Sequence, residues 1–75
     1  MINLLELQSQ KKAIVETVLA SGAQISRLRA LGIVANATIK KLNHTTPRGP
    51  ILVTTAYECD VAMDQDLASK IIVRF

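Results

Sequence analysis

Three observations on this 75-residue sequence predict a mainly β fold, a small barrel or sandwich of five short strands with one embedded helix. β-Branched residues gather in short runs, turn-forming residues stand between the runs, and the sequence contains no internal repeat. Hydrophobic residues make up 49% of the chain, yet only one Tyr, one Phe and no Trp are present, so the core must be aliphatic. The length allows one compact domain over residues 1–75.

The first strand and the helix are the earliest predicted elements. The run KAIVETVL at residues 12–19 carries β-branched side chains and indicates a strand. A short amphipathic helix is predicted over residues 24–31, because Ile25, Leu28 and Leu31 recur three residues apart on one face. The apolar face of such a helix covers part of the core.

The ends of this helix carry local signals. Ser21 and Gln24 have the spacing of a capping box, in which each side chain bonds the backbone N–H of the other residue. Gly32 suits the left-handed conformation that ends many helices, and Ile33 is placed to pack back on the last turn. Asn36 marks a second corner, because Asn tolerates a positive φ better than other non-glycine residues.

The rest of the chain predicts strands, a loop over residues 43–50 and one helical turn. The remaining strands are expected over residues 37–42, 51–55, 59–63 and 70–75. Alternation in the first of these breaks at Lys41 and Leu42, which indicates a β-bulge or a bend of the barrel. Asp64 is placed as the N-cap of a single helical turn over residues 65–69.

Composition favours a soluble protein of the cytoplasm. Cys59 is the only cysteine, so no intrachain disulfide can form, and a lone thiol suits a reducing compartment. The N-terminus lacks the pattern of a signal peptide, and no apolar run is long enough to insert into a bilayer. The formal net charge of +3 is spread along the chain, which favours acidic partners without forming a nucleic-acid-binding tail.

An ordered set of sequence blocks resembles the FeoA family, the small cytoplasmic companions of the bacterial ferrous-iron transporter FeoB. The blocks are RLRALGI, VANA, TIKKL, GPILV and VAMDQDLASKIIV, within a stretch from about Leu4 to Val73. The resemblance implies an SH3-like five-stranded barrel with a short α-helix after the first strand and one helical turn before the last. It also implies a non-enzymatic adaptor without a cofactor, which binds the cytosolic GTP-binding region of FeoB and modulates Fe(II) uptake.

A partner-binding surface is predicted from strand phase and charge. It combines an aliphatic centre with a rim of arginines, and its residues are Arg27, Arg29, Val34, Arg48 and Leu52. The charges would steer the encounter with an acidic partner, and the apolar centre would hold the complex. Unpaired strand edges could also support a homo-oligomer.

Metal binding is the main alternative function. His44 and Cys59 are the weak candidate ligands for Fe(II) or another divalent metal, and neither has a second ligand at a diagnostic spacing. The simpler interpretation makes His44 an exposed loop residue. It makes Cys59 a small buried hydrophobe on the same strand face as Val61 and Met63.

Two further function classes find little support in the residues. Nucleic-acid binding by a small basic barrel needs aromatic platforms on which bases stack, and only Tyr57 and Phe75 are aromatic. Catalysis needs convergent nucleophilic, acidic or phosphate-binding groups, and no such grouping can be assembled from the sequence. A protein-binding role is therefore the prediction.

Overall fold

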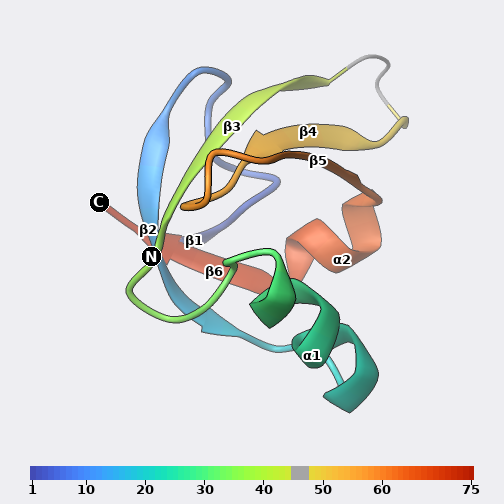
Figure 1. Ribbon diagram of the computed structural model, residues 1–75. Coiled ribbons are helices and arrows are strands. Elements are labelled where there is room, and N and C mark those ends of the chain that lie inside the picture. The colour runs from blue at the N-terminus through green and yellow to red at the C-terminus, as the bar shows by residue number, and fades with distance from the viewer. Residues whose placement is uncertain (45–47) are drawn as a thin grey trace.

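Six antiparallel strands and two short helices make up the fold (Figure 1). The computed structural model describes residues 1–44 and 48–75, and the side chains of Asn43 and His44 fall outside that description. The strands are β1 (Ile2–Asn3), β2 (Lys12–Val18), β3 (Thr38–His44), β4 (Ile51–Thr54), β5 (Asp60–Met63) and β6 (Ile71–Arg74). The helices are α1 (Gly22–Ala30) and α2 (Gln65–Ser69).

The strands form one sheet in the order β1-β6-β2-β3-β4-β5, and every described pairing is antiparallel. The sheet curls into a barrel that stays open between its two edge strands, β1 and β5. Register shifts between Val15 and Thr17 in β2, and between Lys41 and Asn43 in β3, bend these strands. The shift in β3 confirms the bulge that the broken alternation predicts.

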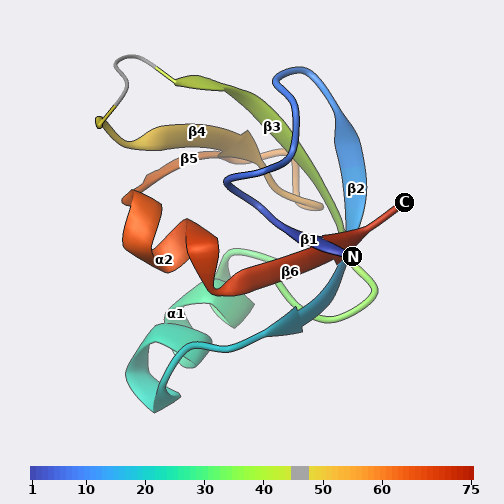
Figure 2. The same cartoon turned by 180° about the vertical axis from the view of Figure 1, so that it is seen from behind.

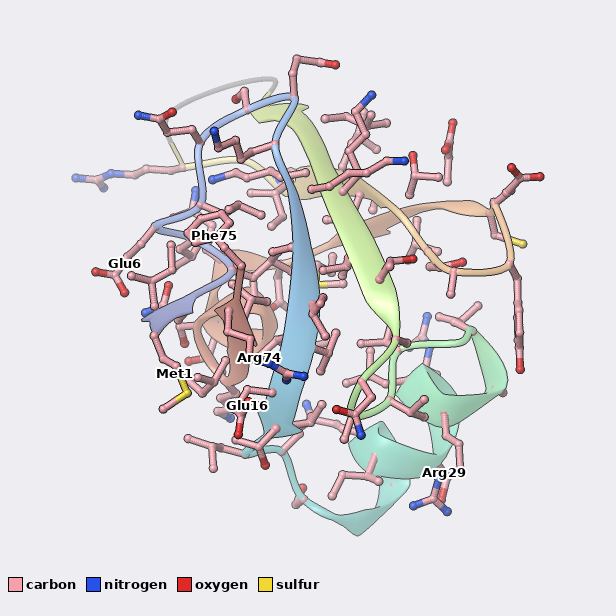
Figure 3. The ribbon with its side chains drawn as sticks, turned by 90° about the vertical axis from the view of Figure 1, so that its left-hand side faces the viewer. Met1, Glu6, Glu16, Arg29, Arg74 and Phe75 are labelled. Carbon is pink, nitrogen blue, oxygen red and sulfur yellow. The ribbon has the colours of Figure 1, made fainter. Side chains whose placement is uncertain are left out.

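The core lies inside the curled sheet and is aliphatic, as the composition predicts. Its buried members are Leu4, Leu7, Ala13, Val15, Leu28, Ile33, Ile39, Ile51, Val53, Met63, Ala68, Ile71 and Val73. Most of them come from alternate positions of the strands, since successive side chains of a strand point to opposite faces. On the outer face Arg74 of β6 pairs with Glu16 of β2, with an N–O distance of 2.8 Å (Figure 3).

The N-terminal segment adds a sixth strand that the sequence does not predict. Ile2 lies opposite Val73, so β1 pairs with the last strand. Asn3 and Glu6 then close a turn by exchanging two hydrogen bonds between side chain and backbone, at 3.0 and 3.1 Å. A strand of two residues has no periodicity of its own, and only its pairing with a distant part of the chain defines it.

The C-terminal end of α1 agrees closely with the prediction. Gly32 has a φ of +87° and Asn36 a φ of +70°, so both corners are left-handed. The N–H of Ile33 donates to the carbonyl of Leu28 at 2.9 Å and the N–H of Gly32 to the carbonyl of Arg29 at 3.0 Å, which is a Schellman motif. Ile33 is buried, and this packing fixes how the chain leaves the helix.

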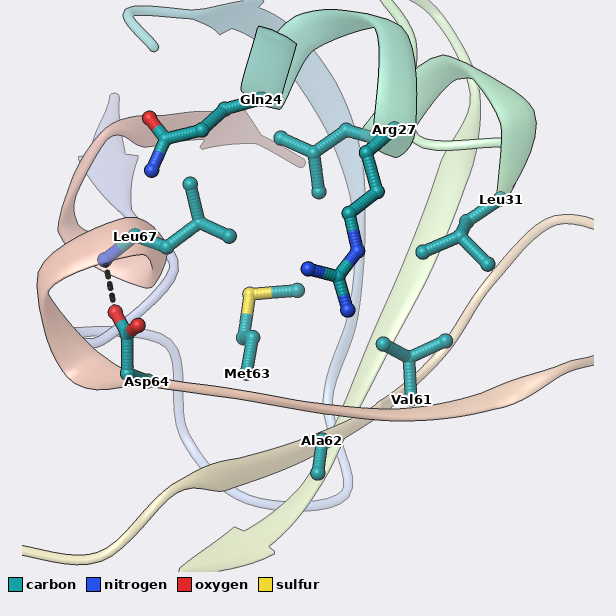
Figure 4. Close-up of a pocket in the computed structure, with 9 residues that line it drawn as sticks. Gln24, Arg27, Leu31, Val61, Ala62, Met63, Asp64 and Leu67 are labelled. Carbon is teal, nitrogen blue, oxygen red and sulfur yellow. Dashed lines mark hydrogen bonds between the residues drawn. The ribbon is translucent and has the colours of Figure 1, made fainter.

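The N-terminal end of α1 differs from the prediction. The helix begins at Gly22 with Ser21 as its N-cap, and the Ser21 side chain makes no capping hydrogen bond among the described residues. The capping box is therefore wrong, and the Gln24 side chain extends toward Leu67 of α2 instead (Figure 4). At α2 the local prediction holds, because the Asp64 carboxylate accepts the N–H of Leu67 at 2.7 Å.

Both helices lie at one end of the barrel, away from the end of β3 and the start of β4, as the two opposite views show (Figure 1, Figure 2). Leu28 of α1 and Ala68 of α2 are buried in the core, so the two helices close this end. Within the described residues, no helix is both long and apolar enough to cross a membrane.

Candidate functional site

Two hollows flank α1, and each is lined by residues of the predicted partner surface. The first, here called the β5 hollow, has a volume of about 190 Å³. It is lined by Gln24, Arg27, Leu28, Leu31, Val61, Ala62, Met63, Asp64 and Leu67 (Figure 4). The second, the β2 hollow, has a volume of about 400 Å³ and is lined by Thr17, Val18, Ile25, Arg29, Ile33, Val34 and Ala35.

The β5 hollow is formed by three elements that are far apart in the sequence. α1 supplies Leu28, β5 supplies Val61 and Met63, and α2 supplies Leu67. Met63 and Leu28 are buried, whereas Val61 and Leu67 are partly buried against the same core. The floor of the hollow is therefore continuous with the core.

Arg27 is the cation of the β5 hollow. Figure 4 shows its guanidinium extending from α1 toward Val61 and Met63. Among the described residues no carboxylate or other acceptor is bonded to this guanidinium. Its position in the last turn of α1 is favourable, because the carbonyl end of a helix carries partial negative charge.

Arg29 belongs to the other side of the helix. It lines the β2 hollow together with Val34, which is partly buried, and it projects from α1 away from the sheet (Figure 3). Residues two apart on a helix point in nearly opposite directions, which separates Arg29 from Arg27. Each hollow therefore combines aliphatic side chains with one arginine.

The structure does not gather the predicted partner surface into one patch. Val34 and Arg29 share the β2 hollow, but Arg27 lines the β5 hollow. Leu52 is partly buried on β4 opposite Ala62 and lines neither of the two hollows. Arg48 is exposed just before β4. Binding of a partner by these residues stays a prediction.

The two candidate metal ligands, His44 and Cys59, do not lie where the sequence predicts. His44 belongs to the end of β3, opposite Ile51, and not to a loop, while its side chain lies outside the described residues. Cys59 is exposed, so its predicted burial is wrong. The reason is that β5 begins at Asp60, which leaves Cys59 in the hairpin turn after Glu58, whose φ is +61°. No group of three or more potential metal ligands occurs within the described part of the chain.

A buried lysine is the feature that sequence reasoning missed. Lys41 is only 2% exposed, and its ammonium donates a hydrogen bond of 2.7 Å to the carbonyl oxygen of Leu5. Burial lowers the pKa of Lys41 below its ordinary value of 10.5, because a charge is less stable away from water. Lys41 lies two residues after the buried Ile39 and opposite the buried Val53, so the regular alternation of β3 places it inside the barrel, and the register shift comes only after it.

An open antiparallel barrel with two short helices defines a small SH3-like domain. The FeoA domain family matches residues 2–75, and this chain belongs to the FeoA family, which is associated with ferrous iron transport. The family prediction is thereby confirmed. No relative was found among curated protein sequences.

Solved structures agree with this family. The FeoA protein from Chlorobium tepidum is 31% identical, with a TM-score of 0.90 over 99% of this chain and 70% of that chain. An iron uptake regulatory protein (FeoA) is 29% identical, with a TM-score of 0.84 over 97% of this chain and 95% of that one. Zinc-bound FeoA from Stenotrophomonas maltophilia, described as an SH3 domain protein, is 26% identical, with a TM-score of 0.80 over 97% and 89% of the two chains.

Proposed function

We propose that this protein is a small non-enzymatic adaptor of the cytoplasm, which binds the cytosolic GTP-binding region of an FeoB-type transporter and modulates Fe(II) uptake. Membership of the FeoA family supports a role in ferrous iron transport. The observation that carries the adaptor role is the pair of hollows beside α1, each with an arginine at an aliphatic surface. Such a surface suits a protein partner.

Apolar and charged groups contribute to a protein interface in different ways. Burying aliphatic side chains such as Val34 supplies most of the binding free energy. Arg27 and Arg29 raise the rate of encounter with an acidic surface and fix its orientation. The formal net charge of +3 acts in the same direction.

The proposed surface is centred on α1, with Arg27, Arg29 and Val34 as its members. Leu52 and Arg48 would extend it only if the partner also reaches the outer face of β4, since neither residue lines a hollow beside the helix. The predicted surface therefore has two parts, one beside α1 and one at or just before β4. We expect substitutions in the part beside α1 to weaken partner binding more.

A chemical-shift titration tests the proposal. The isotope-labelled protein is titrated with the purified cytosolic region of its cognate transporter, and in parallel with Fe(II) alone. The partner should shift the amides of residues 27–36, and Arg29→Gln should weaken its binding. Lys12→Gln is the matched control, because it removes the same charge at an exposed position that lines neither hollow.

Two outcomes would contradict the adaptor role. The absence of any shift with the transporter region would remove the proposed partner. Shifts at Cys59 and His44 with Fe(II) alone, together with silence toward the transporter, would favour direct metal binding. Equal weakening of binding by Arg29→Gln and Lys12→Gln would instead show that Arg29 acts only through long-range electrostatic attraction.

A further inference from the structure

The outer edge of β5 has free backbone groups. In an antiparallel pair, opposite residues alternate between those whose backbone groups bond each other and those whose groups point outward. Thr55 donates its N–H to the carbonyl of Cys59 at 2.9 Å, so this pair is a bonded one. Continuing along the unbroken register, Val61 bonds to β4, whereas Asp60 and Ala62 direct their N–H and C=O groups away from β4.

This edge is accessible. β5 is the last strand of the sheet, and no backbone bond from another described segment reaches Ala62 on its outer side. Ala62 itself is exposed and has a small side chain. An unpaired edge of this kind is a template for one more strand.

The β5 hollow lies directly beside the same edge. Ala62 lines it together with Val61, Leu31 and Leu67, so a chain that paired with Ala62 would place alternate side chains over this hollow. The volume of about 190 Å³ leaves room for an aliphatic side chain. Backbone pairing and side-chain burial can therefore occur at one place.

The charged side chains around the β5 hollow indicate which kind of segment could bind there. The guanidinium of Arg27 extends into the hollow and has no bonded acceptor within the described residues. The carboxylate of Asp64, in the same hollow, already accepts the N–H of Leu67, and Asp60 accepts the hydroxyl of Thr54. A carboxylate in the middle of the incoming segment would meet Arg27, whereas carboxylates at its ends would face the two aspartates.

We propose that an extended acidic and aliphatic segment of the partner protein adds as a strand to the outer edge of β5. One aliphatic side chain fills the β5 hollow, and a central carboxylate pairs with Arg27. The affinity comes from main-chain bonds to Ala62 and from burial of the aliphatic side chain, and the specificity comes from the charge. This inference rests on the proposed function, which makes the partner the cytosolic region of the transporter.

Two matched pairs of variants test it by calorimetric titration with that cytosolic region. Ala62→Pro removes the outward N–H and is compatible with an edge strand, because the N–H that it deletes is not bonded to β4. It should weaken binding at least about tenfold, and clearly more than Ala62→Val, which adds bulk at the same place but keeps the N–H. Arg27→Gln should weaken binding about tenfold, and more than Arg29→Gln does.

Hydrogen exchange in the wild-type complex keeps the test valid if Ala62→Pro fails to fold. The amide of Ala62 should exchange at least about tenfold more slowly in the complex than in the free protein, because it gains an acceptor. Tight binding with unchanged exchange at Ala62, or with equal affinity of the folded proline and valine variants, would overturn the strand addition and leave the proposed function intact. Failure of the wild type to bind at all would overturn both.

Discussion

The two edge strands of the sheet, β1 and β5, differ in whether other parts of the chain cover them. At the β1 edge the chain continues into a turn whose Leu4 and Leu7 side chains are fully buried, and whose Leu5 carbonyl accepts the Lys41 ammonium at 2.7 Å. At the β5 edge Ala62 is exposed, and Arg27 in the adjacent hollow has no bonded acceptor among the described residues. The first edge is covered by the protein itself, and the second is the edge at which we propose that a partner binds.

This difference indicates which parts of a small domain stabilise its fold and which parts are available for binding. The core of a short barrel is small, so buried leucines from the N-terminal segment contribute a large share of the free energy of unfolding. The β5 edge contributes less to folding because its outer groups are unpaired. Substitutions at the β1 edge should therefore unfold the protein, and substitutions at the β5 edge should change binding.

The largest effect is expected for Leu7→Ala. Removing a fully buried leucine from the segment that covers the β1 edge should lower the free energy of unfolding by roughly 2–5 kcal/mol, through lost burial and a residual cavity. Leu19→Ala is the control, because Leu19 is 64% exposed and should change stability by less than about 0.5 kcal/mol. Urea unfolding measures both, and similar losses would show that the N-terminal segment does not secure this edge.

Gly32→Ala should destabilise by about 1–2 kcal/mol, because φ at this residue is +87° and a side chain there is strained. An added Cβ would also meet the Tyr57 ring at 3.1 Å. Gly22→Ala is the matched control, since a Cβ there meets nothing within 4 Å, and the helical start should gain up to about 0.5 kcal/mol. Thermal unfolding of the two variants should shift in opposite directions, and a neutral Gly32→Ala would contradict the left-handed helix end.

A smaller loss, about 1 kcal/mol, is expected for Asp64→Ala. This change removes the acceptor of the Leu67 N–H at the start of α2, next to the β5 hollow. Asp64→Asn retains a side-chain oxygen at the N-cap and should keep most of the stability. Denaturant midpoints compare the two, and equal losses would mean that the carboxylate charge matters more than the capping bond.

The smallest effect concerns pH and Lys41. Because burial lowers the pKa of Lys41 in the folded state below 10.5, the unfolded chain holds this proton more strongly. Unfolding then takes up a proton, so the contribution of Lys41 to stability rises with pH in the range just below 10.5 and is lost as pH falls through the lowered folded pKa. The stability of the wild type relative to Lys41→Met should increase as the pH rises toward 10.5. A flat difference in urea titrations would show that the ammonium is well solvated.

The parts of the fold that the sequence predicts are those decided by local chemistry. Gly32 and Asn36 were predicted as left-handed corners, and Asp64 as a helix cap, because each depends on its own backbone preferences and on near neighbours. The Ser21 capping box failed although it is also local, since the side chain of Gln24 lines a hollow against β5 instead. A local signal is decisive only where no distant contact competes with it.

The parts that the sequence misses depend on distant pairing. β1 exists only because Ile2 meets Val73 at the other end of the chain, and Cys59 is exposed because the hairpin turn ends just before β5. Arg27 and Arg29 were both selected as partner residues, but their placement in separate hollows follows from the way in which β5 and β2 lie on either side of α1. Strand phase alone cannot show which loops and helices meet.

Amide hydrogen exchange of the free protein tests the contrast between the two edges most directly. The N–H of Leu4 donates to Ile71 at 2.8 Å, and the N–H of Val61 is bonded to β4, so both should be protected. The outward N–H of Ala62 should exchange much faster than that of its neighbour Val61, at a rate close to that of an unstructured peptide. Equal protection of Ala62 and Val61 would contradict an open β5 edge, and rapid exchange at Leu4 would contradict stable pairing of the N-terminal segment with the chain at Ile71.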